Sequence, residues 1–101
     1  METNPDYWCI VKIPYKEPVY KVFATWNGGY LGSDSWKANS GIENVIDKET
    51  HYEILGLSGS VYICNKTAYG TTSYGDNILV SASIVPMGEE EAINVLKSYM
   101  K

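Results

Sequence analysis

Apolar residues along the first two thirds of the chain gather in short, dense runs that predict β-strands. The run YWCIVKI at residues 7–13 combines β-branched and aromatic side chains with a single charge, and VYKVFATW at residues 19–26 has the same character. Runs of this length and composition are typical of strands. Between them, Pro14 and Pro18 frame a turn, because proline cannot donate a hydrogen bond to a sheet.

Turn signals and further apolar runs predict that the sheet continues to residue 65. An Asn-Gly pair at residues 27–28 favours a tight hairpin, since both residue types tolerate a positive φ. We therefore predict a return strand over residues 30–38. Three more apolar runs predict strands over residues 42–46, 51–57 and 60–65.

The C-terminal third contains one run with the period of a strand and one with the period of a helix. In ILVSASIV at residues 78–85, apolar residues alternate with serines, which predicts a strand with one solvated face. The loop before it, with its AYG and SYG repeats, is expected to form a wide hairpin tip. Residues 88–100 have apolar side chains at helical spacing, with three glutamates at the start and a lysine near the end, which predicts a helix.

These elements together predict an α+β fold. We expect a compact antiparallel β-sheet, or a small barrel-like sheet, of five to seven strands with one C-terminal helix packed on it. A chain of 101 residues has the size of one domain, so a single domain over residues 1–101 is expected.

Composition and charge narrow the classes of partner and compartment. The net charge is −4 and the chain contains no arginine, which argues against binding to duplex nucleic acid. No run is long and apolar enough to span a bilayer, and the N-terminus does not have the pattern of a signal peptide. We therefore expect a cytoplasmic protein (in the host cytoplasm if the chain is viral) with no membrane partner. Cys9 and Cys64 lie in apolar runs and are expected to be reduced core thiols.

The sequence contains no recognisable set of catalytic or metal-binding residues. His51 is the one histidine, and the two cysteines are far apart in the chain, so neither a metal site nor a cofactor is expected. The segment GLSGS at residues 56–60 has serine where a nucleophile elbow needs its second glycine. These observations favour a protein that is not an enzyme.

Two segments that combine serine, glycine, an aromatic residue and lysine are candidates for binding a small polar ligand. Backbone amides in glycine-containing turns and a nearby lysine can hold phosphate, and an aromatic face can stack on a base. Ordinary turns have the same composition, and that interpretation stays open. The candidate ligand-binding residues are Trp36, Lys37, Asn39, Ser40, Ser58, Ser60, Tyr62 and Lys66.

Several large aromatic residues fall in predicted loops or at strand ends, where a core does not require them. Tyrosine and tryptophan are enriched at the centres of protein–protein interfaces. We therefore expect a partner-binding surface formed by Trp26, Tyr30, Tyr69 and Tyr74.

Three functional hypotheses follow from these candidates. The first is a non-enzymatic protein that sequesters a small polar ligand such as a nucleotide. The alternative is a protein–protein inhibitor or adaptor that docks through its loop aromatics and acidic surface on a host protein, and the third is a small hydrolase. In size and composition the chain resembles the small accessory and anti-defence proteins of phages, some of which have the first two activities. The alternating run at residues 78–85 also suggests a homo-oligomer, because an edge strand can pair with its own copy.

Overall fold

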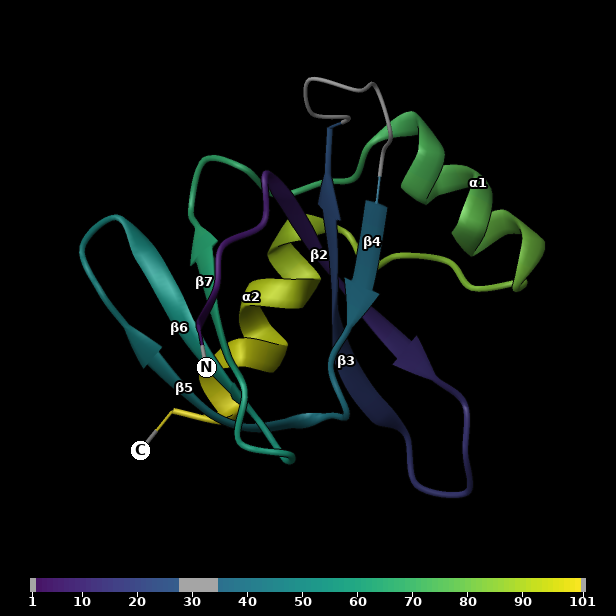
Figure 1. Ribbon diagram of the computed structural model, residues 1–101. Coiled ribbons are helices and arrows are strands. Elements are labelled where there is room, and N and C mark those ends of the chain that lie inside the picture. The colour runs from purple at the N-terminus through teal and green to yellow at the C-terminus, as the bar shows by residue number, and fades with distance from the viewer. Residues whose placement is uncertain (1, 28–34, 101) are drawn as a thin grey trace.

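The structure, a computed structural model, describes residues 2–27 and 35–100. Within these residues the chain forms two β-sheets and two helices (Figure 1). The first sheet is antiparallel, with the order β2-β3-β4, and consists of β2 (Tyr7–Ile13), β3 (Val19–Trp26) and β4 (Ser35–Ala38).

The second sheet has the order β1-β7-β6-β5. Its strands are β1 (Glu2–Thr3), β5 (Ile42–Asp47), β6 (His51–Gly56) and β7 (Val61–Asn65). The pairs β5–β6 and β6–β7 are antiparallel, whereas β1 runs parallel to β7. The helices are α1 (Ser73–Ser81) and α2 (Glu89–Ser98), and neither helix in the described part of the chain is long and apolar enough to cross a membrane.

The main core lies between the two sheets, where α2 fills the space (Figure 1). The first sheet contributes Trp8, Ile10, Val22 and Ala24, which alternation places on one face of β2 and β3. From α2, Ala92 and Leu96 are buried against them, at the i, i+4 spacing of one helical face. The second sheet contributes Val45, Tyr52, Ile54, Tyr62 and Cys64.

Tyr69 links this core to the chain before α2. Its hydroxyl donates a hydrogen bond to the carbonyl of Met87 at 2.6 Å and accepts one from the backbone N–H of Ile10 at 3.1 Å. Its ring also meets Trp8 edge to face, with the ring centres 4.9 Å apart. Tyr69 therefore joins three segments that are distant in the sequence.

The opposite face of the first sheet is covered by α1. Cys9, Val11 and Phe23 point to this face and pack against Leu79 of the helix. Thr72 caps the helix N-terminus, since its Oγ1 accepts a hydrogen bond from the N–H of Gly75 at 3.0 Å. At the other end Ser83 has a φ of 58°, and the N–H of Ile84 returns to the carbonyl of Leu79 at 2.9 Å. This Schellman-type ending turns the chain back toward the sheet.

Most predicted elements are confirmed. The strands over residues 7–13, 19–26, 42–46, 51–57 and 60–65 and the C-terminal helix agree with the observed elements to within one or two residues. Cys9 and Cys64 are buried and unbridged, as expected. The return strand is present as β4, while its predicted start and the glycines of the Asn-Gly turn lie outside the described residues.

Three expectations about the fold are wrong. Residues 78–85 form the end of α1 and the turn after it, because Ile78, Leu79 and Ala82 also share a helical face and can pack on the sheet. The preceding loop is accordingly no hairpin tip, and the second tyrosine-glycine pair opens the helix. The strands form two open sheets rather than one sheet or barrel, and the described chain has two helices where one was expected.

Candidate functional site

The two serine- and glycine-containing segments, residues 35–42 and 57–66, are in contact where their turns meet. The N–H of Ser58 donates to Oγ of Ser40 at 3.0 Å, and the N–H of Leu57 donates to the carbonyl of Gly41 at 3.1 Å. These contacts arise where the chain enters β5 and where it turns from β6 into β7, since Ile42 pairs with Gly56. The two segments of similar composition are thus in contact in the fold.

The polar groups of this contact mainly bond to the protein itself. Oδ1 of Asn39 accepts a hydrogen bond from the N–H of Val22 at 2.9 Å, in place of a ladder partner for β3. Gly56 donates to the carbonyl of Ser60 at 2.8 Å, which closes the turn between β6 and β7. Nδ2 of Asn39 is buried, and in the described chain it has no hydrogen-bond partner. The segments therefore form two turns that hydrogen-bond to the rest of the protein, rather than an open phosphate-binding site.

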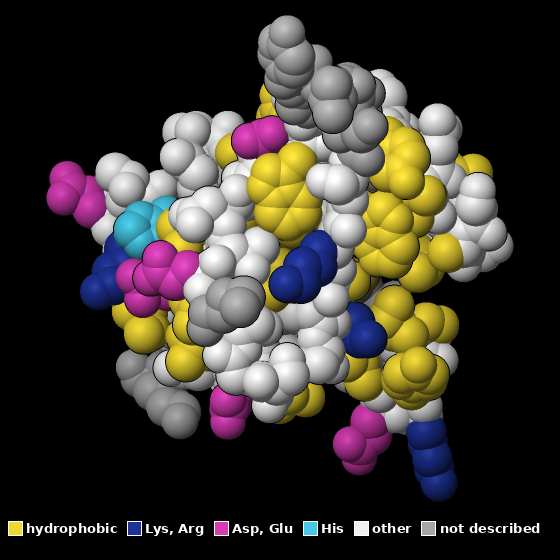
Figure 2. Space-filling model, in the orientation of Figure 1, with side chains coloured by type: hydrophobic (Ala, Val, Ile, Leu, Met, Phe, Trp, Pro, Cys, Tyr) yellow, Lys and Arg dark blue, Asp and Glu magenta, His cyan; other side chains and the backbone are white. Residues whose placement is uncertain are grey.

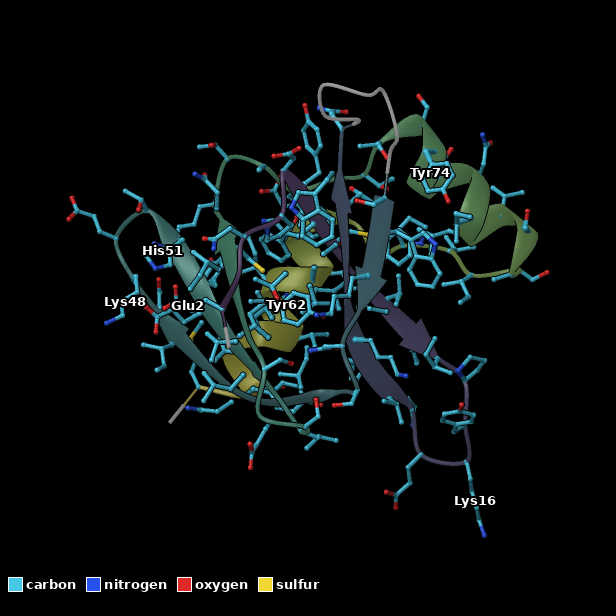
Figure 3. All side chains as sticks on the ribbon, in the orientation of Figure 1. Glu2, Lys16, Lys48, His51, Tyr62 and Tyr74 are labelled. Carbon is cyan, nitrogen blue, oxygen red and sulfur yellow. The ribbon has the colours of Figure 1, made fainter. Side chains whose placement is uncertain are left out.

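Tyr62 and Lys66 lie away from these turns. Tyr62 is fully buried between the sheets, in the middle of the molecule (Figure 3), and burial raises the pKa of its hydroxyl above the usual value. Lys66 follows β7 at the end opposite Ser60, where its Nζ is 2.6 Å from Oδ1 of Asp47. The hydrogen bond to Asp47 is the main cause that raises the pKa of Lys66. The structure thus divides the eight candidate ligand-binding residues among several places.

The candidate partner-binding aromatics are also separated. Trp26 is half-buried, and its Nε1 donates to the carbonyl of Asn4 at 2.8 Å. Tyr69 is half-buried in the structural role described above. Tyr74 is exposed near the start of α1 (Figure 3), and Tyr30 lies outside the described residues.

An apolar groove lies between the outer face of the first sheet and α1. The strands contribute Val11, Ile13, Lys21, Phe23, Trp36 and Ala38 to its walls. The helix and the turn after it contribute Ile78, Leu79, Ala82 and Ile84. We call this feature the Trp36 groove; its volume is about 210 Å³, and Lys21 carries the one charged side chain among its lining residues.

Trp36 forms the exposed part of the groove. Its ring stacks on that of Phe23, with the ring centres 5.4 Å apart and the planes 20° from parallel. The indole is nevertheless 45% exposed, which is unusual for so large an apolar side chain in a small protein. Figure 2 shows hydrophobic side chains gathered over this side of the molecule, around β4 and α1. Tyr74 is one helical turn before Ile78, so it extends the same side of α1 beyond the groove.

Two lysines flank this apolar surface. Lys21 is part of the groove wall, while alternation places Lys37 on the other side of β4 from Trp36. Among the described residues the one lysine–carboxylate ion pair is Lys66–Asp47, which includes neither of these lysines.

The arrangement around His51 offers little for catalysis. Its Nδ1 lies 3.3 Å from Oγ1 of Thr50 and its Nε2 lies 3.4 Å from Oε2 of Glu53. All three residues belong to one short surface segment, whereas a hydrolytic triad needs a buried carboxylate and donors for an oxyanion. Across residues 2–27 and 35–100, no group of three or more His, Cys, Asp or Glu side chains is placed to hold a metal ion.

Comparisons with protein-family models, with curated proteins and with solved structures found no match to this chain. The candidate site is therefore defined by its geometry alone.

Most of the groove was not predicted from the sequence. Phe23 was expected only as part of the strand over residues 19–26, and the apolar residues of 78–84 were not connected with Trp36. One available signal was that both faces of residues 7–13 and 19–26 are apolar, which requires a covering layer on each side of the sheet. A single C-terminal helix could cover only one of them.

Proposed function

We propose that this chain is a non-enzymatic binding protein that docks on a partner protein through the Trp36 groove. The observation that carries the proposal is the half-exposed indole of Trp36, stacked on Phe23 at the edge of an apolar cavity. Tryptophan is among the residues that contribute most to binding when they lie beside a pocket that a partner fills. The docking alternative from the sequence is therefore favoured over the small-ligand hypothesis.

The size and chemistry of the groove support a protein side chain as its occupant. Pockets for drug-sized ligands usually measure about 300–1,000 Å³ and present several convergent polar groups. The Trp36 groove measures about 210 Å³, and nine of its ten lining side chains are apolar. That space suits one aliphatic or aromatic side chain better than a nucleotide.

A peptide-display selection on the immobilised full chain tests the proposal. Selected peptides are then measured against the wild type, Trp36→Ala and Tyr15→Ala. Tyr15 is the matched control because it is 64% exposed and lies in the turn between β2 and β3, outside the groove lining. We expect Trp36→Ala to weaken binding about tenfold, the loss of more than about 1 kcal/mol that an interface anchor shows, and Tyr15→Ala to leave it unchanged.

The fold should survive this change. Because Trp36 is half-exposed, its removal costs the stack on Phe23, about 0.5–1.5 kcal/mol, and part of its buried area. A melting curve of Trp36→Ala checks this point. If no selected peptide binds the folded Trp36→Ala variant more weakly than the wild type, the docking proposal is wrong.

Sequestration of a small polar ligand is a second candidate, because the two serine- and glycine-containing segments are in contact. Binding to the folded state raises the melting temperature by mass action. A panel of nucleotides at millimolar concentration tests this hypothesis, and an unchanged melting temperature would remove it. For either role we propose a cytoplasmic location, with which the free thiols of Cys9 and Cys64 agree.

A further inference from the structure

Within residues 2–27 and 35–100, the first sheet ends in a strand whose outer side has no paired strand. In the order β2-β3-β4, β4 pairs in these residues with β3 alone, and all four of its residues are exposed. An exposed strand edge presents backbone N–H and C=O groups that can pair with another strand. Exposed edges of this kind bind extended peptides in several classes of recognition domain.

The ladder between β3 and β4 determines which backbone groups point outward. The N–H of Asn39 bonds to the carbonyl of Val22 at 3.2 Å, so these two residues form a hydrogen-bonded pair. Hydrogen-bonded and non-hydrogen-bonded pairs alternate along an antiparallel ladder. Ala38, opposite Phe23, and Trp36, opposite Thr25, are therefore non-hydrogen-bonded positions. Their N–H and C=O groups point away from β3, toward the open edge.

These two residues are also the ones whose side chains line the groove. In a sheet, directly opposite residues on neighbouring strands project their side chains to the same face. A strand that paired with Trp36 and Ala38 would thus place its facing side chains beside the Trp36 groove. The open edge and the apolar cavity form one continuous surface.

The charges around this surface select the occupant further. Lys21 lies on the groove face and Lys37 on the opposite side of β4, and neither takes part in the ion pairs of the described residues. Asp76, the acidic residue of α1, lies in the first turn, away from the helix end that lines the groove. Dark blue lysine side chains lie beside the hydrophobic ones in Figure 2. Acidic side chains on the face of an added strand away from the groove would therefore lie beside Lys37.

We propose, building on the proposed docking function, that β4 binds an extended partner segment in which apolar and acidic residues alternate, by adding it as a fourth strand to the first sheet. An apolar side chain of that segment enters the Trp36 groove. Its carboxylates, on the face of the added strand away from the groove, approach Lys37. The partner's backbone bonds to the outward N–H and C=O groups of Trp36 and Ala38.

The test uses synthetic fluorescein-labelled peptides of about seven residues, the length of a typical strand. The first alternates leucine and aspartate, the second alternates leucine and lysine, and the third is the first with its central amides N-methylated on the bonding side. Binding to the full-length protein is followed by fluorescence anisotropy. We expect the aspartate peptide to bind at least about tenfold more tightly than either of the others, a difference of about 1.4 kcal/mol.

Ala38→Pro tests the same contact from the protein's side. Proline removes the outward N–H of Ala38, which β3 does not use, and proline is tolerated at an open strand edge. Ala38→Val is the matched control, because it adds comparable bulk and keeps the N–H. We expect Ala38→Pro to bind the aspartate peptide about tenfold more weakly than Ala38→Val does, since the bulk that both variants add to the groove cancels in this comparison. If Ala38→Pro does not fold, the N-methylated peptide decides the question alone.

The outcomes separate this inference from the docking proposal. A peptide whose binding is weakened by Trp36→Ala, but not by Ala38→Pro or by N-methylation, would refute strand addition and leave the groove as the docking site. Preference for the lysine peptide, or no binding of the aspartate peptide, would also refute the inference. Sedimentation of the wild type provides a further check, since a dimer that Ala38→Pro dissociates would make a second copy of the chain the occupant of the edge.

Discussion

Replacing Gly75 by alanine should displace α1 from the sheet. Gly75 is buried in the first turn of α1, against the first sheet. A Cβ at this position would overlap Oγ1 of Thr71 and Cγ2 of Thr25, and it would lie 3.1 Å from Cε2 of Phe23. Thr25 cannot move aside easily, because it is fully buried and its hydroxyl donates to the carbonyl of Tyr7 at 3.4 Å. The helix must therefore shift.

The size of the effect follows from two opposing contributions. Alanine is favoured over glycine within a helix by about 1 kcal/mol. Overpacking a filled site typically costs about 1–3 kcal/mol, and overlap with two atoms places Gly75→Ala at the upper end of that range. The free energy of unfolding should thus fall by about 1–2 kcal/mol. For a domain of this size the melting temperature should drop by about 5–15 °C.

Chemical denaturation followed by circular dichroism measures this change. Asn77→Ala is the control, since Asn77 is exposed on the same helix and its replacement should raise stability by up to about 0.7 kcal/mol. The Gly75→Ala protein should also bind groove-dependent peptides more weakly, because α1 forms one wall of the groove. A Gly75→Ala protein as stable as the Asn77→Ala protein would show that α1 does not pack on Thr25 and Phe23 as described.

Two further predictions concern buried polar groups. Tyr69→Phe should lower the free energy of unfolding by about 1–3 kcal/mol, because the N–H of the buried Ile10 and the carbonyl of the half-buried Met87 both lose their partner. Tyr74→Phe should change it little, and equal effects of the two variants would contradict the role of Tyr69. Burial raises the pKa of Cys9 from 9.0 to about 12 and raises that of Cys64 as well, so between pH 9 and 12 the unfolded chain binds fewer protons than the folded protein. The contribution of these thiols to the free energy of unfolding should accordingly be constant below pH 9. Above pH 9 it should fall by more than about 1 kcal/mol per pH unit for each thiol. Urea denaturation measures this change, and a flat profile from pH 9 to 11 would contradict the burial of the thiols.

The strands and α2 were predictable because their local sequence and their final environment agree. Residues 7–13 and 19–26 combine strand-forming side chains with a proline turn, and these runs pair in register as a hairpin. The segment at residues 78–85 lacks this agreement, since its apolar positions fit a strand and a helix almost equally well. Two features outside the run favour the helix: the N-cap at Thr72 and the space for a small residue at Gly75, on which the helix docks. β1 has only two residues and no pattern of its own.

The candidate site was predictable only in parts. Trp36 stood out as a large aromatic residue among small polar ones, and Ser40 and Ser58 proved to be in contact. Grouping Lys66 with Ser60 ignored the strand between them, which at about 3.3 Å per residue separates its ends by roughly 15 Å. Which sheet face remains partly open depends on how the helices pack, and no local pattern contains that information.

The groove exists because α1 is too short for the sheet face that it covers. A helix of nine residues is about 13 Å long, whereas a strand of eight residues such as β3 extends about 26 Å. A helix of this length cannot cover the full length of the face. On the groove face β3 has Lys21, whose aliphatic stem can cover apolar surface while its charge stays in water, and β4 adds Trp36 over Phe23. With this packing the indole of Trp36 remains half-exposed beside the open edge of β4. A single extended segment that pairs with β4 would both add a strand to the first sheet and cover its apolar face.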